Sequence, residues 1–173
     1  MTPPEQHFNM ALAFQKRGDM GQAEAHYRRA IALAPMYSDA WNNLGIIAQN
    51  HHNPKAAIEC YLTALRYNPR YAPSWGNLGA CFEQSGRQEA AIAVYQVALA
   101  LKPSPEILSN LAGLYRERGR FDVAYACYRR ALALPPTPNR VHIHSAWVFT
   151  VDQDPSSKIE DRARVKREFR SGL

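Results

Sequence analysis

Trp41-Asn42-Asn43-Leu44-Gly45 recurs farther along the chain as Trp75-Gly76-Asn77-Leu78-Gly79. Both stretches keep the tryptophan, the second asparagine, the leucine and the glycine. Residues three apart on an α-helix share a face, so the tryptophan and the leucine are expected to pack on the same side. The glycine has no side chain and leaves room for the close approach of a second helix. The two stretches therefore predict a helical unit that repeats along the chain.

Other residues recur at the same interval over most of the sequence. The prolines that close the units are Pro35, Pro69, Pro103 and Pro136, and the last interval is shorter than the others by a single position. The same intervals separate one set of tyrosines and two sets of alanines: Tyr27, Tyr61, Tyr95 and Tyr128; Ala23, Ala57, Ala91 and Ala124; Ala30, Ala64, Ala98 and Ala131. Small side chains set against large ones let neighbouring helices interdigitate, and proline ends a helix. Each unit is therefore predicted to end with a closely packed helix.

This pattern, with a period of about 34 residues, resembles the tetratricopeptide repeat. The resemblance covers residues 4–136. It implies an all-α fold, a right-handed superhelical solenoid of antiparallel helix pairs. We place four repeats at residues 4–37, 38–71, 72–104 and 105–136, and a helical capping or linker segment at residues 137–173. In such a solenoid each pair contacts only its neighbours, and the stacked pairs share one elongated core.

Four asparagines occupy the same position of the four repeats. They are Asn9, Asn43, Asn77 and Asn110, which we call the asparagine ladder. Asparagine is a mediocre residue for a helix interior, so helix propensity does not explain the set. The resemblance implies that this position faces the inner groove of the solenoid. One amide offers an acceptor and two donors, which suits the backbone of an extended polypeptide. The ladder therefore predicts a peptide-binding groove.

The alternative is structural. The same amides can hydrogen-bond to neighbouring helices and hold the repeats together. A mixed role is also open, because each amide has more hydrogen-bonding groups than one contact uses.

The segment after the repeats extends the resemblance. Residues 140–155 begin with arginine, contain a His-Ser step and a Phe-Thr-Val step, and end in Asp154-Pro155. They resemble the segment that follows the repeats in bacterial relatives of the O-linked N-acetylglucosamine transferases (glycosyltransferase family 41-like proteins). Residues 146–147 are Ala-Trp where that pattern has Asn/Ser-Leu. By that resemblance the asparagine ladder would hold the polypeptide acceptor of such an enzyme.

Composition indicates a folded domain, and three cysteines without disulfide or zinc spacing lead us to expect a reducing cytoplasm. Of the 173 residues, 46% are hydrophobic and 21% are charged, which is the balance of a globular protein. The net charge is +6, but no basic run alternates with aromatics, so we expect no specific nucleic-acid partner. We expect neither a membrane span nor a signal peptide, because no long apolar run or basic leader occurs.

No pattern of chemistry-bearing residues predicts catalysis, a metal site or a cofactor. The three cysteines, Cys60, Cys81 and Cys127, have no zinc-ligand spacing and are expected to be small buried side chains. His51 and His52 are adjacent, and His142 and His144 are two apart, which places them on different faces of a helix. The sequence given also lacks the nucleotide-sugar-binding lobes of a transferase.

Three hypotheses about function follow. The first is a non-enzymatic module that binds an extended polypeptide through the asparagine ladder. The second is the acceptor-binding part of a protein-glycosylating transferase. The third, and weakest, is a scaffold that self-associates through its open ends.

Overall fold

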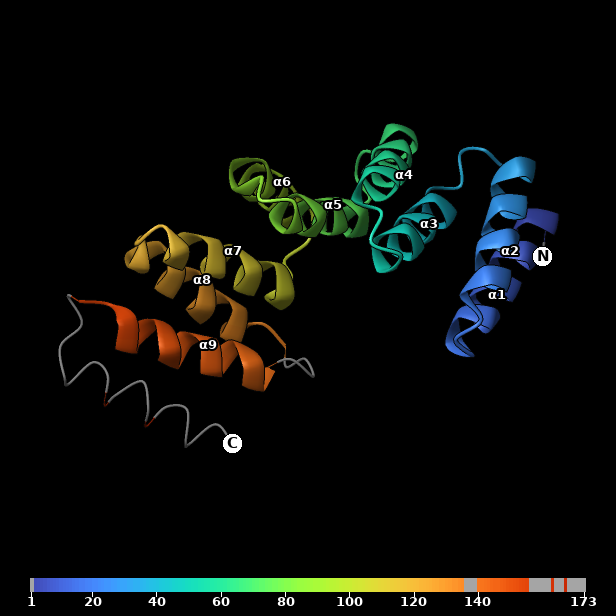
Figure 1. Ribbon diagram of the computed structural model, residues 1–173. Helices are drawn as coiled ribbons and strands as arrows, with labels where there is room; N and C mark the ends of the chain where they lie inside the picture. The colour runs from blue at the N-terminus through green and yellow to red at the C-terminus, as the bar shows by residue number, and fades with distance from the viewer. Residues whose placement is uncertain (1, 136–139, 156–162, 164–166, 168–173) are drawn as a thin grey trace. The chain divides into compact units, whose positions relative to one another are not determined.

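The computed structural model describes residues 2–135, 140–155, 163 and 167. These residues form helices and no strand, which confirms the predicted all-α fold (Figure 1). The helices are α1 (Pro3–Lys16), α2 (Met20–Leu33), α3 (Ser38–Asn50), α4 (Pro54–Tyr67), α5 (Ala72–Gln84), α6 (Gln88–Leu101), α7 (Pro105–Glu117), α8 (Phe121–Ala133) and α9 (Arg140–Gln153). Of the helical capping or linker segment predicted at residues 137–173, only residues 140–155, 163 and 167 are described.

The first eight helices form four antiparallel pairs, each joined by a tight turn. Three of these turns contain a glycine in the left-handed region, at Gly18, Gly86 and Gly119, with φ of 82°, 71° and 70°. In the second pair the corresponding residue is His52, with φ of 55°. The next residue, Asn53, caps α4, because its Oδ1 accepts a hydrogen bond from the backbone N–H of Ala56 at 3.2 Å.

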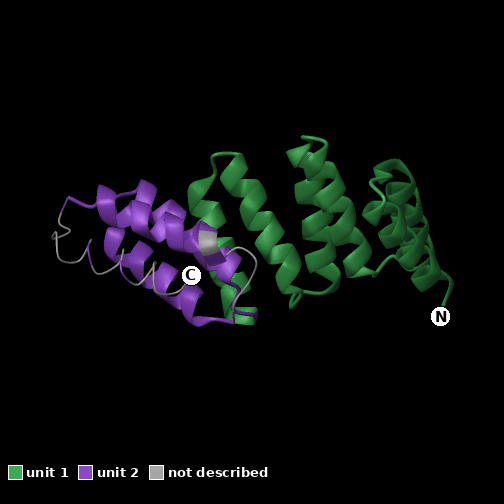
Figure 2. Cartoon of the chain, turned by 90° about the horizontal axis from the view of Figure 1, so that it is seen from below, with its two compact units in different colours: residues 1–101 green, residues 102–173 purple. Residues whose placement is uncertain are grey.

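The chain divides into two compact units, residues 1–101 and 102–173 (Figure 2). In the first unit α2 packs on α3 and α4 packs on α5, and the first helices α3 and α5 also touch each other. The pairs of this unit therefore stack in chain order, each on its neighbour. In the second unit α9 packs on α8 and α7.

One buried tyrosine anchors the second helix of every pair. These tyrosines are Tyr27, Tyr61, Tyr95 and Tyr128, and at most 1% of each is exposed. In the second and third pairs the ring lies against the glycine of the first helix. A Cβ added to Gly45 would meet the Tyr61 ring at 2.4 Å, and one added to Gly79 would meet the Tyr95 ring at 2.5 Å. Any larger residue would therefore push the two helices of the pair apart.

The buried tyrosine hydroxyls of the first unit donate within their own pair. In the first unit each donates to a side-chain oxygen twelve residues earlier: Tyr27 to Gln15 at 2.7 Å, Tyr61 to Gln49 at 3.0 Å and Tyr95 to Glu83 at 2.7 Å. In the fourth pair that position is Arg116, which cannot accept a hydrogen bond. Burial raises the pKa of Tyr128, and the Thr150 hydroxyl on α9 acts against that rise. Helix α9 packs on α8 and α7.

In the second and third pairs, two positions face the pair before. In the second pair these are Trp41 and Cys60, which pack against the apolar cluster around Tyr27. In the third pair Trp75 and Val94 pack in the same way against the cluster around Tyr61. The equivalent positions of the first pair hold two histidines. The first pair is therefore polar where the next two pairs carry Trp and an apolar partner.

These two residues, His7 and His26, form the histidine pair. Their Nδ1 atoms lie 3.0 Å apart, and the Phe14 ring stacks on His26 with 5.3 Å between the ring centroids. Burial, the neighbouring His7 and the positive charge of Arg29 lower the pKa of His26 below its usual 6.5. The His26 imidazole is therefore neutral at neutral pH, and the hydrogen-bonded pair covers the apolar core at this end of the repeats.

We expect His52→Gly to stabilise the protein by about 0.5–1 kcal/mol, because glycine adopts the left-handed conformation without the strain that His52 carries. Urea unfolding followed by circular dichroism measures the change. The matched variant is Gly86→Ala, at a turn where an added Cβ meets nothing within 4 Å. It should destabilise the protein by about 1 kcal/mol. Destabilisation by His52→Gly would show that the imidazole makes a contact worth more than the strain.

We also expect the first pair to lose stability on acidification. The pKa of His26 is lower in the folded than in the unfolded chain, so the unfolded chain binds the proton more readily. The stabilisation that the neutral His26 gives to the folded chain is fully present above about pH 6.5. It decreases as the pH falls below that value toward the lower pKa of the folded chain. Urea unfolding at about pH 7.5 and about pH 5.5 should show a larger loss in the wild type than in His26→Asn. Equal losses would contradict the assignment.

Candidate functional site

The candidate site is the surface of the first helices, where the asparagine ladder lies. Asn9 on α1 and Asn110 on α7 are exposed, whereas Asn43 on α3 and Asn77 on α5 are half-buried. Asn9, Asn43 and Asn77 belong to the first unit, and Asn110 belongs to the second. The four side chains are therefore equivalent in sequence but differ in environment.

The half-buried asparagines each bond to the preceding repeat. The Nδ2 of Asn43 donates to the hydroxyl of Tyr27 on α2 at 3.0 Å. The Nδ2 of Asn77 donates to the Oδ1 of Asn42 on α3 at 3.0 Å. These contacts correspond to the structural alternative, in which the ladder links neighbouring repeats.

Asn42 connects these contacts and was not singled out by the repeat pattern. Its side chain is only 4% exposed. Its Oδ1 accepts from Asn77 and from the hydroxyl of Ser74 at 2.9 Å, and Ser74 is completely buried. Its Nδ2 lies 3.3 Å from the Oδ1 of Asn43 and donates to it. One buried amide therefore satisfies polar groups from two repeats.

The bonds form a continuous network through three repeats. It runs from Asn77 through Asn42 and Asn43 to the Tyr27 hydroxyl, and from there to Gln15 on α1. Buried polar groups that are all paired specify one relative placement of the helices that carry them. We call this chain of contacts the amide network. It fixes the ladder side chains of the second and third repeats in defined rotamers.

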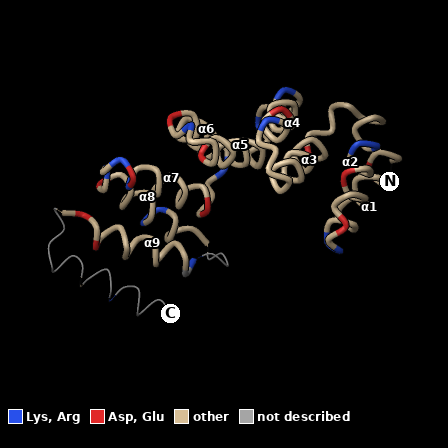
Figure 3. Tube along the Cα trace, viewed as in Figure 1, with Lys and Arg blue, Asp and Glu red and all other residues tan. Residues whose placement is uncertain are grey.

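The first helices of these two repeats carry little charge (Figure 3). Helix α3 has a single charged residue, Asp39, and α5 has only Glu83. Asp39 accepts a hydrogen bond from the Tyr71 hydroxyl at 2.8 Å, and Glu83 accepts from Tyr95. Asp39 is thus engaged with the residue that precedes α5, and Glu83 is engaged with α6. The other residues of α3 and α5 that are not buried are uncharged, and they include both amides and apolar side chains.

A second amide pair crosses between the same helices. The Nε2 of Gln49 on α3 donates to the Oε1 of Gln84 on α5 at 2.8 Å. These residues line a cavity of about 220 Å³ together with His52, Pro54 and Ser85. The ends of α3 and α5 are therefore joined by neutral side chains, as their middles are.

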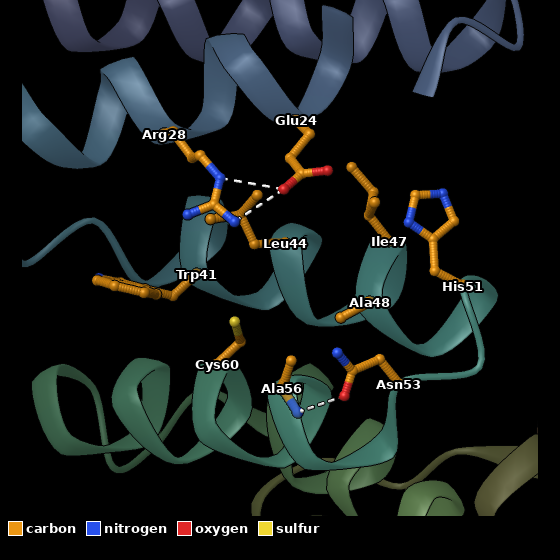
Figure 4. Close-up of a pocket in the computed structure, with 10 residues that line it drawn as sticks. All are labelled: Glu24, Arg28, Trp41, Leu44, Ile47, Ala48, His51, Asn53, Ala56 and Cys60. Atoms are coloured by element: carbon orange, nitrogen blue, oxygen red, sulfur yellow. Dashed lines mark hydrogen bonds and ion pairs between the residues drawn. The ribbon is translucent and has the colours of Figure 1, made fainter. Parts of the chain in front are cut away.

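A cavity of about 170 Å³ lies between α2, α3 and α4 (Figure 4). Its walls are mostly apolar and include Trp41, Ile47 and the thiol of Cys60. The charged groups at its edge, Glu24 and Arg28, pair with each other at 2.8 Å. Burial raises the pKa of the Cys60 thiol, which keeps the sulfur protonated and weakly nucleophilic. The arrangement offers no activated nucleophile.

Two further observations concern a membrane span and a metal site. Among the described helices, none has the length and apolar character needed to cross a membrane. Within the described ranges, no three His, Cys, Asp or Glu side chains are grouped as metal ligands.

Family models with the description tetratricopeptide repeat match three parts of the chain, residues 4–37, 44–106 and 107–141. Among solved structures, TTC0263, a thermophilic tetratricopeptide repeat protein of Thermus thermophilus, is 30% identical with a TM-score of 0.70. The match covers 84% of this chain and 81% of that one.

Two further structures share the fold at lower identity. PilF of Pseudomonas aeruginosa is 21% identical with a TM-score of 0.83, and the match covers 98% of this chain and 76% of that one. A MamA protein is 18% identical with a TM-score of 0.76, over 98% and 90% of the two chains. No curated protein matches in sequence. The comparisons give no support to the resemblance to the O-linked N-acetylglucosamine transferases.

We expect Asn42→Ala to be the most damaging single change in the amide network. It leaves the buried Ser74 hydroxyl and the Asn77 amide without an acceptor, at a cost of about 2–3 kcal/mol. Asn43→Ala should cost about 1 kcal/mol, because the Tyr27 hydroxyl, which loses its bond to Asn43, still bonds to Gln15. Urea unfolding of both variants compares the two. An equal or larger loss in Asn43→Ala would contradict the central place of Asn42.

Proposed function

Since the chain belongs to the tetratricopeptide repeat family, we propose that it is a protein–protein interaction module that holds an extended polypeptide along its first helices. The asparagine ladder of the first unit makes the main contacts, through Asn9, Asn43 and Asn77, and Asn110 occupies the equivalent position of its own repeat in the second unit. The ligand is recognised chiefly by its backbone. The observation that carries the proposal is the amide-rich, nearly uncharged surface of α3 and α5.

The hydrogen-bonding capacity of the ladder supports this role. Asn43 and Asn77 each donate one amide hydrogen to the amide network. Each amide has a second hydrogen that a peptide carbonyl can accept. The Oδ1 of Asn77 is an acceptor for a peptide N–H. The network holds these groups in place before the ligand arrives, which reduces the ordering cost of binding.

The engagement of the charged groups also supports recognition of a backbone. A free carboxylate or ammonium on this surface would select ligand side chains of the opposite charge. Asp39 and Glu83 instead accept hydrogen bonds from tyrosine hydroxyls. Desolvating the remaining amides costs less than desolvating a charge, provided that the ligand pairs with them.

We infer that the module acts without catalysis. Its buried tyrosines serve the core, and burial raises the pKa of each of its three cysteine thiols. A groove that binds by hydrogen bonds alone needs no activated group.

The experiment is a peptide array of unrelated sequences, followed by fluorescence anisotropy on the peptides that bind. Replacing single backbone amides of a bound peptide with esters should weaken binding at some positions. Asn43→Ala/Asn77→Ala should lose about 1 kcal/mol per hydrogen bond, or about thirtyfold in Kd for two.

The control is Asn42→Ala, which removes a contact of the amide network but retains the side chains of Asn43 and Asn77 that would contact the ligand. It should reduce stability more than it reduces binding. If the two variants weaken binding in proportion to their loss of stability, the ladder only links repeats and the proposal fails. Indifference of binding to backbone esters would likewise rule out backbone recognition.

A further inference from the structure

The first pair contains a second cluster of functional groups, away from the asparagine ladder. The histidine pair places two imidazole Nδ1 atoms 3.0 Å apart, one from α1 and one from α2. The rings are tilted by 39°, with 5.2 Å between their centroids. Both side chains are half-buried, on helices that pack tightly against each other. Two nitrogen donors are thus held close together by a rigid helix pair.

The place of the pair in the repeat argues against a purely apolar packing role. The equivalent residues of the second pair are Trp41 and Cys60, and those of the third are Trp75 and Val94. Any two polar side chains would make this position polar. Two imidazoles in direct contact are a more specific arrangement, because they supply two nitrogen ligands at once.

We propose that the histidine pair is a binding site for a divalent late transition-metal ion, of the Cu²⁺ or Ni²⁺ type, with water completing the coordination sphere. This site is independent of the proposed peptide groove. In the neutral pair one Nδ1–H donates to the other Nδ1. On binding, that proton moves to the Nε2 of the same ring, and both Nδ1 lone pairs turn to the ion. No electron is transferred, and no proton needs to leave the chain.

The separation of the two nitrogens selects the kind of metal. With metal–nitrogen bonds of about 2.0–2.1 Å, ligands at a right angle are about 2.8–3.0 Å apart, and ligands at a tetrahedral angle about 3.3–3.4 Å. The 3.0 Å separation fits a right angle. Cu²⁺ and Ni²⁺ prefer square-planar or tetragonal sites with nitrogen ligands, whereas Zn²⁺ prefers tetrahedral ones. Each imidazole needs only a turn about its χ2 bond, a soft torsion.

The groups around the histidine pair have opposing effects. Burial favours neutral imidazoles, which can bind a metal ion, and the positive charge of Arg29 opposes a bound cation. Phe14 stacks on His26 with 5.3 Å between the ring centroids. Arg29, one helical turn from His26, adds a positive charge that disfavours both protonation and metal binding. Met10 lies one turn from His7 on α1 and is 47% exposed, where the next two repeats have a buried leucine. A thioether favours Cu⁺ over Cu²⁺, so the proposed site uses the two imidazoles alone.

The test is isothermal titration of the full, untagged chain with CuCl2, NiCl2 and ZnCl2 near neutral pH. We expect one saturable ion per chain, with affinity in the order Cu²⁺, Ni²⁺, Zn²⁺, and a Tm that rises with NiCl2 concentration. His7→Trp/His26→Val installs the pair that the third repeat uses, and should keep the helical circular dichroism spectrum while losing the ion. His26→Asn provides a second variant if that one misfolds.

The matched control is His51→Asn/His52→Asn, which removes the adjacent histidines of the second repeat and should leave binding unchanged. The paramagnetic resonance spectrum of bound Cu²⁺ should show two nitrogen ligands in the wild type and lose them in His26→Asn. Absence of saturable binding, retention of the ion by His26→Asn, or its loss in the control would each overturn the proposal. Tighter binding of Zn²⁺ than of Ni²⁺ would contradict the right-angle geometry.

Discussion

The packing of one buried tyrosine against the facing helix is the constraint on which the rest of the structure depends. The rings of Tyr61 and Tyr95 occupy the space that a side chain at Gly45 or Gly79 would take. This contact sets how closely the two helices of a pair approach. The hydroxyl then needs a partner, because a buried donor left unpaired is costly. In the first unit Gln15, Gln49 and Glu83 accept it, and each such bond fixes the register of one pair.

The amide network adds a second layer to this arrangement, between pairs. Asn43 reaches the Tyr27 hydroxyl of the pair before it, and Asn42 receives Asn77 of the pair after it. The residues that join the repeats are therefore the residues proposed to hold a ligand. Such a surface is rigid before binding, which favours affinity. It also makes ligand binding and protein stability depend on the same side chains. Variants that each remove a single contact of the network are needed to separate the two effects.

The sequence was sufficient to predict the helix pairs and the buried tyrosines, because these features recur once in every repeat. The glycine turns followed the same register, with His52 as the exception. The contacts of Asn42 could not be predicted in this way. The equivalent residues in the other repeats are Phe8, Gly76 and Ser109, so the position carries no repeated signal. His7 and His26 are nineteen residues apart, and only the packing of α1 on α2 brings them into contact. The asparagine ladder was evident in the sequence, but its bonding partners were not.

The change from Gln15, Gln49 and Glu83 to Arg116 at one position of the repeat has a consequence for moving pairs between places in the array. In the first unit the acceptor twelve residues before the tyrosine satisfies the hydroxyl inside its own pair. Arg116 cannot accept that hydrogen bond. A protein engineer who wished to copy the fourth pair to another place in the array would therefore replace Arg116 with glutamine.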